Sequence, residues 1–274
     1  MLTPMTPTGI VLALVEVALI FGSAYYIRKR DKSTGGNLQH IGMISYYWFI
    51  FTIFTGFMWE TSFVCQYHAV NEYSAKLIAN NQTVWFTPYT WDYLLPWKFA
   101  YIFYGDYGAY ADREYMINTN DWSRIIESTH AIYCALFSCL ALIFKYVKWE
   151  NHYNIAVGVA MGSQLMNSIL YMAEYFVQID DPDNINYPSS NFPSGILLDK
   201  RPFMWVNVFW LLMPSYIITV YLICPSTENN SGNISSSKSL PPLYGSISPE
   251  ISINNRNVNV DCNNCDGCIQ NKDD

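Results

Sequence analysis

Several common patterns are missing from this chain of 274 residues. It has no basic stripe interleaved with stacking aromatic residues, so nucleic acid is not an expected partner. It has no internal repeat of about 20–50 residues. It also lacks the alternation of apolar and polar residues that a membrane β-barrel requires. These absences leave helices as the expected form of any segment that crosses a membrane.

Metal-binding patterns are incomplete. Cys262, Cys265 and Cys268 form a CxxCxxC string near the C-terminus, which could hold a metal ion or accept palmitate. A structural zinc site normally has a full tetrahedral set of ligands, and neither a histidine nor a fourth cysteine stands near this string. We therefore interpret the three as incidental tail cysteines, and we expect no metal and no cofactor.

What the chain has instead is long apolar segments. It is 51% hydrophobic, yet its mean hydropathy is only +0.08 because polar loops and a polar tail dilute the apolar stretches. Five segments reach the ~20 residues needed to cross a bilayer: Gly9–Ile27, Met43–Cys65, Ser123–Val147, Tyr153–Val177 and Pro202–Cys224. The predicted fold class is all-α, a polytopic membrane bundle of five transmembrane helices with a disordered cytoplasmic tail.

Basic residues set the predicted orientation. The first apolar segment contains Glu16 and is followed, not preceded, by the basic cluster Arg28–Lys32. A signal peptide carries its positive charge first, so we expect an uncleaved anchor. The positive-inside rule places this cluster, together with Lys145 and Lys148 after the third segment, in the cytoplasm. The C-terminus is then cytoplasmic, and the glycosylation sequon at Asn81 is lumenal.

Composition divides the chain into three parts. Residues 1–42 hold the anchor and its basic loop, residues 43–224 form a four-helix membrane domain, and residues 225–274 are a tail rich in Ser, Asn, Pro and Asp. The tail has too few apolar residues to offset the entropy of ordering, so we predict that it is disordered.

The longest connection between apolar segments, residues 67–122, is dense in aromatic residues. They include Trp85, Phe86, Tyr89, Trp91, Tyr93, Trp97, Phe99, Tyr101, Phe103 and Tyr104. Because Trp and Tyr favour the membrane–water interface, one interpretation is a belt on the lumenal surface. The alternative is a lid over the mouth of a pocket.

Two glutamates inside apolar segments are the strongest functional signal. Glu60 lies deep in the segment Met43–Cys65, and Glu127 lies near the start of the segment Ser123–Val147. An ionisable group in lipid is costly, so it usually faces the bundle interior and has a function there. Glu127 and His130 are spaced i, i+3 and share a helix face, which makes them a candidate proton-handling pair. The alternative for each acid is a structural hydrogen bond between helices.

Asn207 and Trp210 form a second i, i+3 pair. An asparagine can bond a carboxyl group or a ligand hydroxyl, and the indole face can stabilise a cation. Ordinary packing is the alternative for this tryptophan. We expect both residues to line one cavity with Glu60, Glu127 and His130.

The order of these motifs resembles the EXPERA domain, the four-helix unit of the emopamil-binding protein family. The resemblance covers about Tyr47–Ile223. It is carried by Trp48-Phe49 before Glu60, Trp97-Lys98, Ala111–Tyr115, Ile126–Thr129, Gln164 with Leu170-Tyr171, and Phe203–Pro214. The additional helix before this unit is also similar to the emopamil-binding proteins proper, whereas the sigma-two-receptor relatives lack it.

This resemblance implies a sterol isomerase of the endoplasmic reticulum membrane, which moves a ring double bond from Δ8 to Δ7 through a carbocation. It implies that Glu60, Glu127 and His130 are catalytic and that Asn207, Trp210 and Tyr171 bind substrate. The partners it implies are a sterol or another hydrophobic small molecule and membrane lipids, with a homodimer as one option for assembly.

Two positions depart from the family pattern. Gly56 stands where the family has a histidine one turn before Glu60, and His130 stands where it has a threonine. One interpretation is that the imidazole has moved to another wall of the cavity. We then expect His130→Thr to abolish isomerisation and an added Gly56→His to restore it at least partly, since Gly56 shares a face with Glu60. The other is a non-catalytic protein that binds sterols or cationic amphiphiles, as the sigma-two-like relatives do.

Overall fold

The computed structural model describes residues 6–117, 121–179 and 201–223. The chain divides into two units, residues 1–227 and 228–274, and all described residues belong to the first. The predicted disordered tail and its CxxCxxC string lie outside the described residues. Within those residues the structure is helical, and β-type pairing is limited to an isolated bridge between Thr8 and Pro88.

Five helices in the described part of the chain are long and apolar enough to cross a membrane. They are Gly9–Ser33, Met43–Cys65, Trp122–Tyr146, Glu150–Phe176 and Pro202–Tyr221. Each coincides with a predicted segment, with ends that differ by a few residues. The predicted all-α membrane bundle is therefore confirmed, and the chain is a multi-pass membrane protein.

Several of these spans are built from more than one helical element. The first is α1 (Gly9–Ser33), and the second joins α2 (Met43–Phe54), the π-helical turn η2 (Thr55–Glu60) and α3 (Thr61–Cys65). The third joins α7 (Trp122–Thr129), the π-helical turn η5 (His130–Ala135) and α8 (Leu136–Tyr146). The fourth is α9 (Glu150–Ile179), and the last joins α10 (Pro202–Val206), α11 (Val208–Ile218) and η7 (Thr219–Ile223).

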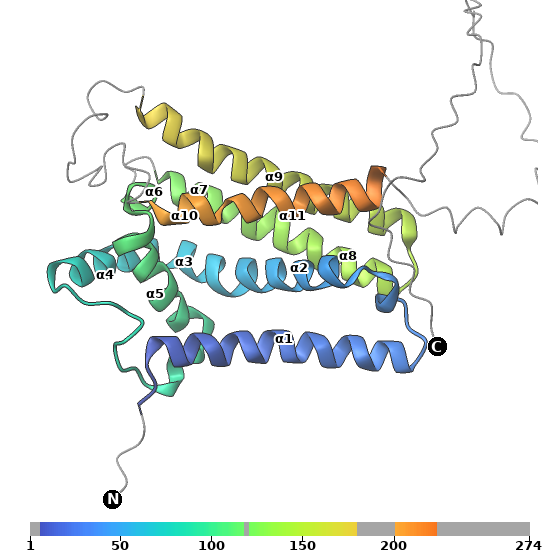
Figure 1. Ribbon diagram of the computed structural model, residues 1–274, viewed down its shortest axis with the longest axis horizontal. Coiled ribbons are helices and arrows are strands. Elements are labelled where there is room, and N and C mark those ends of the chain that lie inside the picture. Colours follow the sequence, from blue (N-terminus) through green and yellow to red (C-terminus); the bar gives the residue numbers. More distant parts are fainter. Residues whose placement is uncertain (1–5, 118–120, 180–200, 224–274) are drawn as a thin grey trace, which may run out of the picture. The chain divides into compact units, whose positions relative to one another are not determined.

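The long helices run side by side with alternating direction (Figure 1). The short loops after α1 and α8 lie at one end, so the basic cluster Arg28–Lys32 and the residues Lys145 and Lys148 lie at the same end. The long aromatic connection lies at the other end, where α1 begins.

The outer surface of the bundle is apolar. In α1, for example, Leu14 is 65% exposed and Leu19 is 59% exposed, while the polar Glu16 is buried. A face of this kind marks contact with a membrane or a partner rather than with water. The outward side chains therefore agree with the assignment of these helices as membrane spans.

The aromatic connection folds into helices. It contains α4 (Tyr67–Ala79), the short 3-10 helix η3 (Trp91–Leu94), α5 (Pro96–Asp106), the π-helical turn η4 (Tyr107–Ala111) and α6 (Arg113–Ile117). Phe86, Trp91 and Trp97 are more than half exposed, as an interfacial belt requires, whereas Phe99, Tyr104 and Tyr107 are buried. The connection thus has both belt-like residues and residues that close the end of the bundle.

Pro214 lies inside α11 without ending it. Proline has no backbone N–H, so the carbonyl one turn earlier loses its usual helical donor. That carbonyl belongs to Trp210, and the Ser168 hydroxyl on α9 donates a hydrogen bond of 3.2 Å to it. A side chain of the neighbouring helix thus satisfies the group that proline leaves open.

A buried ion pair fastens the connection to the start of the last span. Arg201 donates from Nε to Oδ1 of Asp112 at 2.8 Å and from Nη2 to Oδ2 at 3.2 Å. Both side chains are fully buried. The Tyr171 hydroxyl of α9 donates to the same carboxylate. This two-pronged, charge-assisted contact joins segments that are far apart in the sequence.

We predict that Asp112→Ala destabilises the fold by about 3–5 kcal/mol, because it leaves the Arg201 guanidinium buried without its carboxylate. Thermal unfolding of the detergent-solubilised protein measures the loss as a lower Tm. The control is Asp92→Ala, which removes an exposed ion pair with Lys98. Exposed pairs contribute little, so the control should keep the wild-type Tm. Equal Tm values for both variants would contradict the structural importance of the Asp112–Arg201 pair.

Candidate functional site

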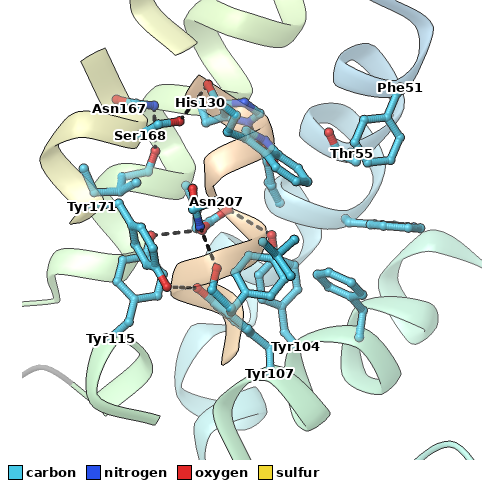
Figure 2. Close-up of a pocket in the computed structure, with 18 residues that line it drawn as sticks. Phe51, Thr55, Tyr104, Tyr107, Tyr115, His130, Asn167, Ser168, Tyr171 and Asn207 are labelled. Carbon is cyan, nitrogen blue, oxygen red and sulfur yellow. Dashed lines mark hydrogen bonds and ion pairs between the residues drawn. The ribbon is translucent and has the colours of Figure 1, made fainter. Parts of the chain in front are cut away.

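A cavity of about 210 Å³ lies within the bundle (Figure 2). All six predicted site residues line it, namely Glu60, Glu127, His130, Asn207, Trp210 and Tyr171. Its other lining residues are Phe51, Thr55, Trp59, Phe103, Tyr104, Tyr107, Tyr115, Ile126, Asn167, Ser168, Phe203 and Val206. The structure therefore brings the predicted residues together, while the role of each in the chemistry stays a prediction.

Two of the ionisable residues lie on π-helical turns. Glu60 is the last residue of η2, His130 is the first of η5, and the two turns contact each other. A π turn widens the helix by one residue and is frequent at functional sites. The Gly56 carbonyl accepts the backbone N–H of Thr61, five residues later, and the Thr61 hydroxyl donates to the same carbonyl at 2.8 Å.

His130 pairs with Glu60 across the contact between η2 and η5. Its Nδ1 lies 2.6 Å from Oε2 and 2.7 Å from Oε1 of Glu60, and both side chains are more than nine-tenths buried. The sequence interpretation joined His130 to Glu127, whereas the hydrogen-bond partner of its Nδ1 is Glu60. His130 and Glu127 share a cavity, but the imidazole is directed across the helix contact toward the other glutamate.

Glu127 is held by two tyrosines of the aromatic connection. Tyr104 donates to Oε2 and Tyr115 donates to Oε1, each at 2.9 Å. Burial, reinforced by the charge of Glu127, raises the pKa of both phenols well above the usual value, so they remain protonated donors. Both oxygens of Glu127 therefore have a phenol as hydrogen-bond partner.

Aromatic rings make up much of the remaining wall. The Trp210 indole packs edge-on against Trp48 at 5.6 Å and Phe51 at 5.7 Å between ring centroids. Trp59 stacks on Phe103 at 4.8 Å. Such rings offer π faces to a positive charge in the cavity.

Two wall residues are held by buried carboxyl groups that do not line the cavity, those of Glu16 and Asp112. The Trp59 indole N–H donates to the buried Glu16 carboxyl of α1 at 3.1 Å, so the first helix orients part of the wall. The Tyr171 hydroxyl is held by Asp112 and, at 3.4 Å, by Tyr107. Tyr171 therefore presents its ring to the cavity, while its hydroxyl is engaged in the Asp112 network.

Sequence reasoning missed the partners of the ionisable residues. These are Tyr104 and Tyr115 beside Glu127, and Gln164 and Trp48 behind His130. Gln164 carried a usable signal, because it is a polar residue in the middle of an apolar span. Tyr115 belongs to the Ala111–Tyr115 motif, but nothing in the sequence linked either tyrosine to Glu127, since the connection that holds them contains many aromatic residues.

The site contains two carboxyl groups in different environments within one cavity. Glu60 is next to an imidazole, and Glu127 accepts from two phenols. Carboxyl groups whose surroundings differ in this way can divide the roles of proton donor and proton acceptor. The aromatic wall suits a substrate that is apolar and becomes positively charged during the reaction.

Comparison of the chain with protein-family models, with curated proteins and with solved structures found no match. The functional interpretation therefore depends on the geometry of the site.

Gly56 of η2 packs closely against η5. A Cβ atom added there would clash with the Ala135 side chain and would lie 3.3 Å from the Ala131 Cα. Small residues on facing helices allow such an approach in membranes. The expectation that Gly56 could be replaced by histidine is therefore wrong, because the site has no room for a methyl group.

We predict that Gly56→Ala destabilises the protein by about 1–3 kcal/mol through overpacking. The control is Gly162→Ala on α9, where an added Cβ has no neighbour within 4 Å. Alanine favours a helix over glycine by about 1 kcal/mol, so the control should be neutral or stabilising. Unfolding midpoints in detergent measure both changes, and a neutral Gly56→Ala would show that the helices can separate without cost.

Proposed function

We propose that this protein is a sterol isomerase of the endoplasmic reticulum membrane that moves a ring double bond from the Δ8 to the Δ7 position. The observation that supports this most is the placement of Glu60, His130 and Glu127 around a single buried, aromatic-walled cavity. The motif resemblance to the emopamil-binding protein family points to the same chemistry.

The proposed reaction needs one proton donor and one proton acceptor. The donor protonates an alkene carbon, a C–H bond forms, and the ring becomes a carbocation. The acceptor then removes a proton from a neighbouring ring carbon, and the electrons of that C–H bond form the new double bond. The Glu60–His130 pair supplies the proton, while Glu127 is the carboxylate that faces the cation and accepts the departing proton.

The cavity must adjust to hold a whole sterol. Its volume of about 210 Å³ is below the roughly 300–1,000 Å³ of typical ligand pockets. The wall residues Phe51, Phe203 and Trp210 are only partly buried. The Trp210 ring packs against the rings of both phenylalanines, and these contacts involve no backbone atoms. We propose that these rings move when the ring system of a sterol enters.

A second candidate function is binding without catalysis. Two glutamates among aromatic rings would also attract a protonated amine carrying an apolar body, since a carboxylate and π faces both stabilise a cation. The observation that favours this reading is the departure from the family pattern at Gly56 and His130. A cationic amphiphile or an unreacted sterol is then the ligand.

We propose that the end of the bundle with the basic residues faces the cytoplasm, and that the C-terminus lies there as well. Asn81, in the turn after α4 at the opposite end, is exposed. We expect glycosidase treatment of microsomes to shift the wild type on a gel but not Asn81→Gln. Protease should remove a tag placed after Asp274 from sealed microsomes, and protection of that tag would show the reverse orientation.

We predict that the wild type restores Δ7 sterols in cells that lack sterol isomerase, as measured by sterol profiling. Glu127→Gln should lower the isomerisation rate about 10²–10⁴-fold, because an amide cannot accept the ring proton. Glu72→Gln, an exposed acid on α4, is the matched control and should behave as the wild type.

Two outcomes decide between the candidate functions. If the wild type reaches the membrane but forms no Δ7 sterol, isomerisation is excluded and binding remains. If Glu127→Gln is as active as the wild type, Glu127 is not the acceptor.

We predict that Trp210→Leu weakens a cationic amphiphile more than a neutral sterol. The indole face contributes about 2 kcal/mol to a desolvated cation, and a leucine of similar apolar character keeps the contact with a neutral ring. Trp205→Leu, at an exposed position of α10, is the control. Equal loss for both ligands in competition binding would remove the electrostatic role assigned to Trp210.

A further inference from the structure

The imidazole of His130 has a second partner, which lies away from Glu60. Its Nε2 is 3.0 Å from Nε2 of Gln164, a fully buried residue in the middle of α9. Gln164 in turn accepts a hydrogen bond of 2.7 Å at Oε1 from the Trp48 indole N–H of α2. Three spans thus meet in one chain of hydrogen bonds from Trp48 through Gln164 and His130 to Glu60.

The direction of this chain is set by Trp48. An indole nitrogen can only donate, so the group of Gln164 that faces Trp48 must be the amide oxygen. The amide NH₂ then faces the opposite way, toward His130 and toward the Thr52 hydroxyl at 3.3 Å. Rotating the amide by half a turn would set its NH₂ against the indole N–H, two donors without an acceptor.

The amide orientation decides where the imidazole carries its proton. Because the NH₂ of Gln164 donates to Nε2 of His130, that nitrogen must be an unprotonated acceptor. The ring proton is then on Nδ1, where it is donated to Glu60. A second proton on Nε2 would point at the NH₂ group, so the contact with Gln164 opposes the imidazolium form, whereas a charged Glu60 would favour it.

We propose that Trp48 and Gln164 are positioning residues that hold His130 neutral, with its proton on Nδ1, so that Glu60 is the group that exchanges protons with the cavity. The catalytic role given to Glu60 rests on the proposed isomerase function, whereas the tautomer of His130 does not. Both imidazole nitrogens are occupied, one by Gln164 and the other by Glu60. Nδ1 lies within hydrogen-bond distance of both Glu60 oxygens, but a carboxyl group has about four lone-pair sites. Glu60 therefore keeps sites for a proton that it exchanges with the cavity, which it lines together with His130.

The proton step then balances without charging the imidazole. Before the reaction Glu60 is a carboxylic acid, whose other oxygen accepts from Nδ1–H. The O–H bond breaks as the proton passes to the alkene carbon. The resulting carboxylate keeps the Nδ1–H hydrogen bond, which stabilises its charge. His130 is therefore a positioning residue as well, and the catalytic role predicted for it from the sequence passes to Glu60.

The test is the protonation state of the His130 ring, read by ¹⁵N NMR. The protein is labelled with ¹⁵N-histidine in micelles, and the four histidines are assigned by single substitution. Long-range ¹H–¹⁵N correlations distinguish a protonated from an unprotonated ring nitrogen. The wild type should show His130 with Nδ1 protonated and Nε2 unprotonated. Protonation of Nε2, in the other tautomer or in the imidazolium, overturns the inference.

Two variants test the role of Trp48 and Gln164. Trp48→Phe keeps a ring but removes the N–H, so the amide can rotate and His130 should show mixed tautomers. Gln164→Glu places acceptors at Nε2 and should protonate both ring nitrogens. Trp205→Phe, an exposed tryptophan, should leave the spectrum unchanged. If Trp48→Phe or Gln164→Glu folds and keeps the wild-type His130 spectrum, the pair does not position the ring.

Turnover provides the catalytic readout. His130→Asn keeps an N–H donor for Glu60 but cannot carry a proton, so kcat should fall by no more than about 10²-fold, the cost of a small misplacement. Glu60→Gln should abolish turnover. Equal abolition by both variants would show that His130 itself carries the proton. If the wild type has no turnover, the proposed isomerase function fails, while the spectrum still decides the tautomer.

Discussion

The close approach of η2 and η5 is the constraint on which the site depends. Gly56 faces Ala131 and Ala135 at a distance that leaves no room for a Cβ atom. Only this approach lets the His130 ring reach Glu60 across the helix boundary. Larger side chains at these positions would hold the helices apart. Glu60 and His130 would then be separate ionisable groups inside the membrane, and each would be desolvated without a partner. By allowing the helices to pack closely, Gly56 allows the Glu60–His130 hydrogen bond to form.

The membrane spans and the overall class could be predicted from the sequence, because apolar length is a strong signal. The six candidate residues could be identified for a related reason: Glu60 and Glu127 are costly in lipid and so must face the interior. Their pairing could not be predicted. The partner of His130 is Glu60, which lies 70 residues away in the sequence and meets His130 only through the contact between η2 and η5. The helical period relates residues within one helix and says nothing about such a contact between helices.

The partners of the acids were beyond sequence reasoning for a different reason. Tyr104 and Tyr115 lie in a connection with many aromatic residues, and nothing in composition distinguishes a phenol that bonds Glu127 from one that meets the lipid headgroups. Only the fold of α5, η4 and α6 separates the two groups. The inward tyrosines complete the site, and the outward Trp91 and Trp97 suit the interface.

The ion pair that anchors this connection has a consequence for biosynthesis. Arg201 is synthesised 89 residues after Asp112, at the start of the final span. During translation the earlier spans can insert while the Asp112 carboxylate still lacks its guanidinium partner and remains hydrated. Burial of Asp112 can follow only when the last span joins the bundle, and that span also supplies Asn207 and Trp210. A nascent chain that stops short of Arg201 would therefore lack both the partner of Asp112 and the last wall of the cavity.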